Sequence, residues 1–264
     1  LDARSLPENE IIETDVCIVG AGTAGITLAH EFIGAPFKVG LLESGGLEPD
    51  RESQALSWGE NIGFPYFPLD VTRVRGFGGS GNSWDIAIEG DRLGVRLRPF
   101  DPIDFVERDW VAHSGWPFTK AHLDPYYERA QAFFEVLPPS FAPKDWVNGG
   151  PNILLPLNSN KIQTILYKFG ARDLLRDHYC ERIEKAPNIT TFLHATVQEV
   201  ETDESGRLGT RLQVACLSGP RFSVSAKVII LALGGLEVPR LLLLSRKYHP
   251  QGLGNQHDLV GRFF

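Results

Sequence analysis

The sequence predicts an α/β fold built around a mostly parallel β-sheet. Its first 42 residues read as a buried strand at 14–19, a glycine-rich turn at 20–25, a helix at 26–33 and a second strand at 37–42. This order within about 30 residues is typical of one βαβ unit. The run at 228–233 is apolar throughout, as expected of a strand that a parallel sheet buries on both faces.

Between these strands the chain is divided into loop-rich and helical stretches. Residues 44–100 are rich in glycine, and helices are predicted at 104–111, 123–136 and 161–178. The second of these contains Asp124 followed by Pro125, a cap residue and a first-turn proline, so we expect it to begin there.

A β-meander is predicted in the last third of the chain. The segments 189–201, 211–217 and 221–228 alternate in polarity or are rich in β-branched residues, and turn sequences separate them. The meander runs into the apolar strand at 228–233, and a helix follows at 237–245.

The composition excludes several functional classes. The chain has 264 residues, of which 42% are hydrophobic and 22% charged, and a net charge of −7. These values are those of an ordinary globular protein, and the acidic balance argues against nucleic-acid binding. Cys17, Cys180 and Cys216 are too few and too scattered for a disulfide framework or a metal site. No apolar run reaches the roughly 18 residues of a membrane span, and no signal peptide is visible, so we expect a cytoplasmic protein.

The glycine-rich turn carries the first functional motif. Gly20, Gly22 and Gly25 fit the pattern G-x-G-x-x-G, with Thr23 and Ala24 before the last glycine. In such a turn the first glycine permits the bend, the second lets a pyrophosphate approach, and the third allows close helix–strand packing. The N–H groups that open the helix favour a phosphate. The motif predicts dinucleotide binding; the alternative is a glycine-rich turn without a ligand.

An acidic residue completes this motif. Glu43 closes the second predicted strand, 18 residues after Gly25. An acidic residue at about this distance accepts hydrogen bonds from the diol of a nucleotide ribose. Because a carboxylate suits a plain ribose better than a 2′-phosphate, Glu43 favours FAD or NAD(H) over NADP.

A second glycine cluster lies in the loop 73–84. Its glycines permit a close backbone approach. Arg75 offers charge near a phosphate, and Ser80, Asn82 and Ser83 offer hydrogen bonds. A simple NAD enzyme does not need a second cluster, whereas the longer FAD does, so the loop favours FAD. The alternative is an ordinary flexible loop.

Four segments together resemble a known family. The chain is similar to the N-terminal half of a glucose–methanol–choline (GMC) oxidoreductase, and within that family to the sugar-oxidising branch of pyranose oxidases and the flavoprotein subunits of gluconate and fructose dehydrogenases. The four matching segments are 19–25 with 41–46, the loop around Gly78 and Gly79, 114–118 with 123–127, and 231–242.

The resemblance implies a fold and a domain division. It implies a Rossmann-like FAD-binding domain with a β-meander, discontinuous and incomplete, at 1–100 and 188–264. Residues 101–187 would then form part of an α+β substrate-binding domain or cap.

The resemblance also implies cofactor-binding residues. Gly20, Gly22 and Gly25 would hold the FAD pyrophosphate, and Glu43 the adenosine ribose. The family contacts adenine through backbone groups at the position of Val197, for which plain strand core is the alternative. The residues expected to line the pyrophosphate and flavin are Arg75, Gly78, Gly79 and Asn82. Ala232 and Gly234 would follow the strand that runs up to the cofactor.

Ser83 departs from part of the family. Some members attach FAD covalently through a histidine in this loop, and serine occupies the corresponding position here. We therefore expect non-covalent FAD.

The resemblance implies a reaction: oxidation of a CH–OH group of a sugar, a glycoside or another alcohol, with hydride transfer to flavin N5. The family supplies the catalytic base from a histidine pair in its C-terminal half, and none of the seven His here matches that motif. We therefore assign no catalytic residue and expect a complementary C-terminal segment or chain. The sequence contains no methionine, which fits a fragment, a split protein or unlisted modified methionines.

Two other functions stay open. One is a family member with non-redox chemistry, such as a lyase or a photodecarboxylase, and the other is a non-catalytic FAD-binding partner subunit. The electron acceptor, oxygen or a quinone, and homo-oligomerisation are also left open.

Overall fold

The computed structural model describes residues 1–83, 86–88, 91–136, 140–146, 154–155, 157, 161–171 and 173–263. The chain forms two compact units. The sheet unit comprises 1–83 and 175–264, and the second unit comprises 84–174. Every candidate site residue named above belongs to the sheet unit.

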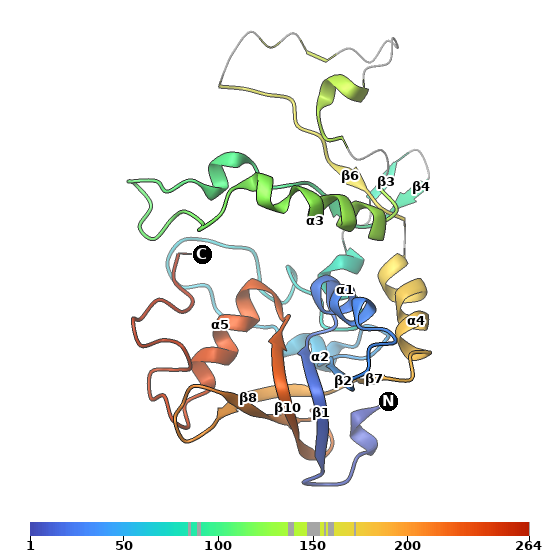
Figure 1. Ribbon diagram of the computed structural model, residues 1–264, viewed down its shortest axis with the longest axis vertical. Helices are drawn as coiled ribbons and strands as arrows, with labels where there is room; N and C mark the ends of the chain where they lie inside the picture. Colours follow the sequence, from blue (N-terminus) through green and yellow to red (C-terminus); the bar gives the residue numbers. More distant parts are fainter. Residues whose placement is uncertain are drawn as a thin grey trace. The chain divides into compact units, whose positions relative to one another are not determined.

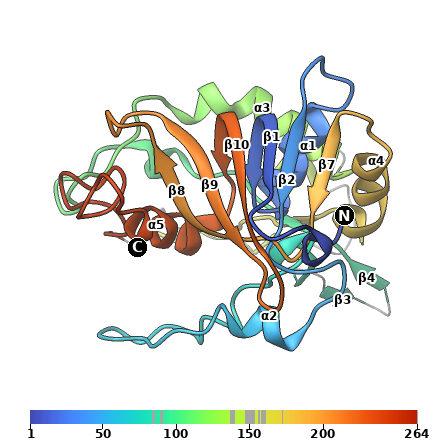
Figure 2. The ribbon, with the colours of Figure 1, turned by 90° about the horizontal axis from the view of Figure 1, so that it is seen from below.

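A six-stranded sheet organises the sheet unit (Figure 2). Its first four strands are mutually parallel, and the last two continue antiparallel, which confirms the predicted α/β fold with its meander. In spatial order the strands are β7 (Ile189–Phe192), β2 (Val39–Leu42), β1 (Ile11–Val19), β10 (Arg221–Leu231), β9 (Gly209–Ala215) and β8 (Thr196–Thr202).

Strand β10 joins the two halves of the sheet. Its beginning pairs antiparallel with β9, and it pairs in parallel with β1 as far as Leu231. The two strands predicted at 221–228 and 228–233 are therefore one, because the same backbone has a meander neighbour on one edge and a parallel neighbour on the other.

The strand predicted at 189–201 is instead two strands, β7 and β8. Between them His194 has a positive φ of 59°. The N–H of His194 donates to the carbonyl of Gly45 and that of Ala195 to the carbonyl of Glu43, at 2.9 and 2.8 Å. These bonds to the end of β2 turn the chain from the parallel edge towards the meander.

In the described part of the sheet unit, α-helices accompany the sheet (Figure 1). α1 (Thr23–Glu31) contacts α4 (Cys180–Glu184), which also packs on β7, and α5 (Gly234–Leu244) packs along β8. The short α2 (Arg51–Ala55) follows the loop after β2. The core between these elements buries Leu212, Val224 and Leu241, removing apolar surface from water.

Short helical turns and bends complete the sheet unit. They are η1 (Ala3–Ser5), η2 (Gly79–Ser83) and the π-helix η5 (Leu174–Tyr179), which begins at the unit boundary and leads into α4. The helix predicted at 161–178 is thus wrong over most of its length, because regular helical structure begins only at Leu174.

The second unit is built on α3 (Lys120–Phe133). The prediction that this helix begins at Asp124 is wrong: it begins four residues earlier, with Thr119 at the N-cap position. Pro125 lies inside the helix, where its missing N–H removes one hydrogen bond near the helix start. The predicted helix at 104–111 is also wrong, since only the 3₁₀ turn η3 (Pro102–Phe105) forms there.

The described residues of the second unit also form two small ladders and one more turn. They are β3 (Ile86–Ile88) with β4 (Asp91–Leu93), β5 (Arg96–Leu97) with β6 (Lys168–Phe169), and η4 (Pro143–Trp146). Among the residues that the structure describes, no helix is long and apolar enough to cross a membrane. The same residues contain no group of three or more metal-ligating side chains.

Candidate functional site

The glycine turn joins β1 to α1, and its three glycines have different surroundings. Gly20 has a φ of 101°, and a Cβ there would lie 2.8 Å from the carbonyl oxygen of Ala232. A Cβ on Gly25 would overlap the carbonyl oxygen of Gly20. A Cβ on Gly22 would meet no atom within 4 Å. Two of the glycines are therefore required by the packing of the turn, whereas Gly22 borders open space.

The first turn of α1 offers free donors. Gly22 is the N-cap residue, no side chain caps the helix, and the first turn carries no acidic residue. Ile26 is the first residue whose N–H bonds back, to the carbonyl of Gly22 at 2.9 Å. The preceding N–H groups, including those of Thr23 and Ala24, have no intrahelical acceptor, and the helix dipole makes this end favourable for an anion.

Glu43 lies buried at the end of β2, beside this turn. Its Oε2 accepts from the N–H of Ala21 and its Oε1 from the N–H of Gly45, both at 2.9 Å. Burial raises the pKa of this carboxyl group, while the two N–H groups and the positive charge of Arg75 act in the opposite direction. Glu43 thus holds the turn against the chain that follows β2.

The second glycine cluster lies directly on the first. The N–H of Gly78 donates to the carbonyl of Ala21 at 2.8 Å, and Gly22 and Gly78 form an isolated parallel bridge. A Cβ on Gly79 would lie 3.0 Å from the Cα of Gly22. The two glycine motifs are therefore one structural site, which neither motif by itself establishes.

The polar side chains of this loop serve mainly the loop itself. Ser80 Oγ accepts from the N–H of Val74 at 3.1 Å, and Asn82 Nδ2 donates to the carbonyl of Phe77 at 2.8 Å. Ser83 ends η2 and is exposed. Hydrogen bonding from Ser80 and Asn82 thus shapes the turn, and a cofactor contact by them stays a prediction.

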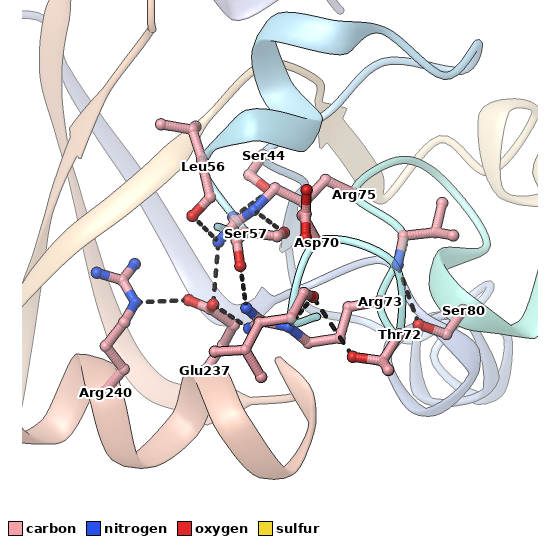
Figure 3. Close-up of polar contacts among 12 residues, drawn as sticks. Ser44, Leu56, Ser57, Asp70, Thr72, Arg73, Arg75, Ser80, Glu237 and Arg240 are labelled. Atoms are coloured by element: carbon pink, nitrogen blue, oxygen red, sulfur yellow. Dashed lines mark hydrogen bonds and ion pairs between the residues drawn. The ribbon is translucent and has the colours of Figure 1, made fainter. Parts of the chain in front are cut away.

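Arg75 is buried in a polar network (Figure 3). Its Nε donates to Ser57 Oγ at 2.8 Å and its Nη1 to Ser44 Oγ at 3.0 Å. Its Nη2 lies 3.1 Å from Oε1 of Glu237. Burial lowers the pKa of Arg75, and Glu237 opposes that effect. The guanidinium group joins the loop to α5, and its expected contact with the cofactor stays a prediction.

Glu237, in the first turn of α5, is the centre of this network. Its carboxylate forms ion pairs with Arg73 and Arg75, and Nε of Arg240 donates to its Oε2 at 2.8 Å. Burial opposes ionisation, but the bonds from Arg240 and the neighbouring charges outweigh it and lower the pKa of Glu237. We call these four residues the Glu237 cluster; it holds three arginines against one carboxylate and so carries net positive charge.

A groove of about 540 Å³ extends from this cluster along β8 and α5. This volume lies within the range of roughly 300–1,000 Å³ typical of small-molecule sites. We call it the β8–α5 groove, and its lining includes Arg75, Thr196, Val197, Gln213, Arg240 and Leu244. A cavity of about 30 Å³ shares four of these residues and is also lined by Gly20 and Glu43.

The residues that follow β10 lie beside the glycine turn. The N–H of Ala232 donates to the carbonyl of Val19 at 2.8 Å. Gly234, with a φ of 82°, begins α5, and a Cβ there would meet no atom within 4 Å. The structure therefore brings Glu43, Gly78 and Ala232, from three separate segments, against the glycine turn.

The sequence reasoning missed the Glu237 cluster as part of the site. Glu237 and Arg240 lie three residues apart at the start of a helix, a spacing that predicts a side-chain pair. Nothing in the local sequence indicates that Arg73 and Arg75 complete it.

Comparison with known proteins identifies the relationship. No protein-family model matches the chain. It is 23% identical over 303 residues to 2-methyl-1,2-propanediol dehydrogenase of Mycolicibacterium austroafricanum, covering 95% of this chain and 54% of that protein. It is 26% identical over 307 residues to 6‴-hydroxyparomomycin C oxidase of Streptomyces lividus, covering 94% and 53%. It is 24% identical over 331 residues to the fructose dehydrogenase large subunit of Gluconobacter japonicus, covering 96% and 58%. The chain is a homologue of the GMC oxidoreductases.

Solved structures agree on the fold of this GMC homologue. Pyridoxine 4-oxidase from Mesorbium loti matches with a TM-score of 0.51 and 19% identity, over 88% of this chain and 51% of that one. Formate oxidase matches with a TM-score of 0.52 and 17% identity, over 91% and 48%. The resemblance expected from the sequence is confirmed, and the chain spans about half the length of the relatives it matches.

Proposed function

We propose that this chain is the cofactor-binding part of an FAD-dependent oxidoreductase that oxidises a CH–OH group of an alcohol or a sugar. The observation that carries the proposal is the contact between the two glycine motifs, which places Gly78 and Gly79 on the turn formed by Gly20–Gly25. The names of the relatives, a propanediol dehydrogenase, a hydroxyparomomycin C oxidase and a fructose dehydrogenase large subunit, support the substrate class.

The residues present fit a dinucleotide. The uncapped N-terminus of α1 offers N–H donors to a pyrophosphate, and the space beside Gly22 lets it approach. Glu43 lines the small cavity together with Gly20 and Val197, where it would meet a ribose. Val197 on β8 lines the groove that would take the adenine, and the carbonyl of Ala232 packs against Gly20 of the turn.

The bound FAD would supply the hydride acceptor for the reaction. The chain's own contribution is to bind and orient that group. The glycines exclude side chains from the turn, and the Glu237 cluster adds positive charge beside it. None of the seven His matches the family's catalytic pair, so the base that takes the hydroxyl proton would come from a complementary C-terminal segment or chain.

The two compact units would have different roles. The sheet unit would bind the cofactor, and the second unit would form part of the substrate-binding domain. Large apolar side chains in the sheet unit support a covering segment: Trp58, Phe64 and Phe67 are each more than 70% exposed. A contiguous exposed apolar surface marks a contact site, and the complementary segment is the covering partner that we propose for these side chains.

The test is to purify the protein together with any co-expressed partner chain and to record its absorption spectrum. We expect a flavin spectrum that bleaches when a sugar or a diol is added without oxygen. A protein that neither retains nor rebinds FAD would overturn the proposal. Bound flavin that no alcohol or sugar reduces would overturn the catalytic part and favour the non-catalytic or non-redox alternatives.

A further inference from the structure

Arg240 occupies a distinctive place in the β8–α5 groove. It lines both the groove and the small cavity beside Gly20 and Glu43, together with Thr196 and Val197 of β8. Its side chain is about half exposed, whereas Arg75 in the same cluster is buried. Arg75 and Arg240 of the Glu237 cluster both line the groove, and Arg240 presents the more exposed side chain of the two to a ligand there.

Only one edge of the Arg240 guanidinium is used by the protein. Nε donates to Oε2 of Glu237 at 2.8 Å, which fixes the group on α5. Within the described part of the chain, its two terminal nitrogens form no hydrogen bond and no ion pair. Figure 3 shows these nitrogens on the side of Arg240 away from Glu237.

The anchoring by Glu237 makes Arg240 a prepared binding group. An arginine held at Nε retains a planar face and four N–H donors for a partner, and it loses less conformational freedom on binding. Apolar side chains near it in the groove, those of Val197 and Leu244, provide surfaces suited to a flat ring. A guanidinium plane attracts an aromatic ring that lies over it.

We propose that Arg240 binds the adenine base of the dinucleotide, with its guanidinium group against the ring. This inference rests on the proposed function and deepens it, since it names the residue that recognises the adenosine half. Glu237 then has a second role, because it positions Arg240 as well as joining α5 to the loop of Arg73 and Arg75.

The test compares ligand binding to flavin-free protein by calorimetry, using FAD, adenosine and FMN as probes. Arg240→Met keeps the length of the side chain and removes the charge and the planar group. We expect this change to raise the dissociation constants for FAD and adenosine by the same factor, about tenfold, and to leave that for FMN unchanged. Arg240→Lys should weaken FAD and adenosine binding by an intermediate factor.

A matched control is Arg246→Met. Arg246 follows α5, is exposed and does not line the groove, so all three dissociation constants should be unchanged. Circular dichroism melting and the FMN titration show whether each variant is folded.

The outcomes separate the two proposals. If the unaltered protein binds FAD and adenosine and Arg240→Met binds both equally well, the role of Arg240 is refuted and the proposed function stands. If FAD binding weakens and adenosine binding does not, Arg240 serves a phosphate and the adenine assignment is refuted. If the unaltered protein binds neither FAD nor adenosine, the proposed function itself fails.

Discussion

Glu237 forms an ion pair with Arg75 across two distant parts of the chain, with Oε1 lying 3.1 Å from Nη2. Both side chains are largely buried, and the pair links α5 to the loop that carries the second glycine cluster. The same arginine donates to Ser44 and Ser57, so one guanidinium group ties three segments together.

We expect Glu237→Gln to destabilise the protein by about 3 kcal/mol, because it leaves buried arginines without their counter-charge. Urea unfolding followed by fluorescence measures the change. Glu181→Gln is the control: it removes an exposed carboxylate paired with Lys185 and should leave the unfolding midpoint unchanged. Equal effects of the two substitutions would show that the Glu237 cluster does not stabilise the fold.

The effect of Glu237→Gln should depend on pH. The pKa of Glu237 is lowered in the folded protein, so the carboxylate stabilises the fold above the usual glutamate value of 4.5. That contribution is lost as the pH falls through the lowered native pKa, since the unaltered carboxyl group is then protonated as well. The difference in unfolding free energy between variant and parent should have its largest value at pH 7 and become smaller below pH 4.5. A difference that is the same at pH 7 and pH 3 would contradict this.

Gly25→Ala should lower the stability of the fold, whereas Gly22→Ala should lower the affinity for FAD. A Cβ at position 25 overlaps a backbone carbonyl, so we expect a loss of about 2–3 kcal/mol in stability. A Cβ at position 22 enters open space at a negative φ, so the fold should tolerate it while FAD binding weakens by about tenfold. Thermal melting and FAD titration separate the two effects. If Gly22→Ala binds FAD normally, the space beside Gly22 does not receive the cofactor.

The three cysteines should differ in reactivity. Burial raises the pKa of Cys17 to about 12 and also raises the pKa of Cys216, so neither is a thiolate at neutral pH. Cys180 has a pKa raised by partial burial but is only partly covered. Titration with a chromogenic disulfide should label Cys180 first in the native protein and the other two only after unfolding. Rapid labelling of native Cys180→Ser would contradict this.

FAD should be released on denaturation. Ser83, at the end of η2, lacks the ring nitrogen needed for a histidyl–flavin bond. After acid precipitation the flavin should be in the supernatant, and the mass of the chain should equal that of the polypeptide alone. A chain heavier by the mass of FAD would refute the non-covalent assignment.

The local part of the site was predictable. Gly20, Gly22, Gly25 and Glu43 lie within one βαβ unit, where residue spacing and strand direction alone determine which residues meet. The structure places Glu43 against Ala21 of the turn, as this spacing requires.

The longer-range arrangement was not predictable from the same reasoning. The helices expected at 104–111 and 161–178 are mostly absent, because apolar residues at helical spacing also occur in turns that are held by contacts with other segments. The cofactor contacts of Ser80 and Asn82 stay a prediction; their bonds to the backbone of their own loop depend on how that loop folds, which residue type alone does not indicate.

The amino-acid sequence alone thus establishes the α/β class, the nucleotide motif and the relationship to the GMC oxidoreductases, because each depends on short motifs that can be recognised one segment at a time. The tertiary structure decides which segments share the site. It merges two predicted strands into β10, places Gly78 on Gly22, and surrounds Glu237 with Arg73, Arg75 and Arg240. These contacts join residues far apart in sequence, and only the packing of the whole sheet unit brings such residues together.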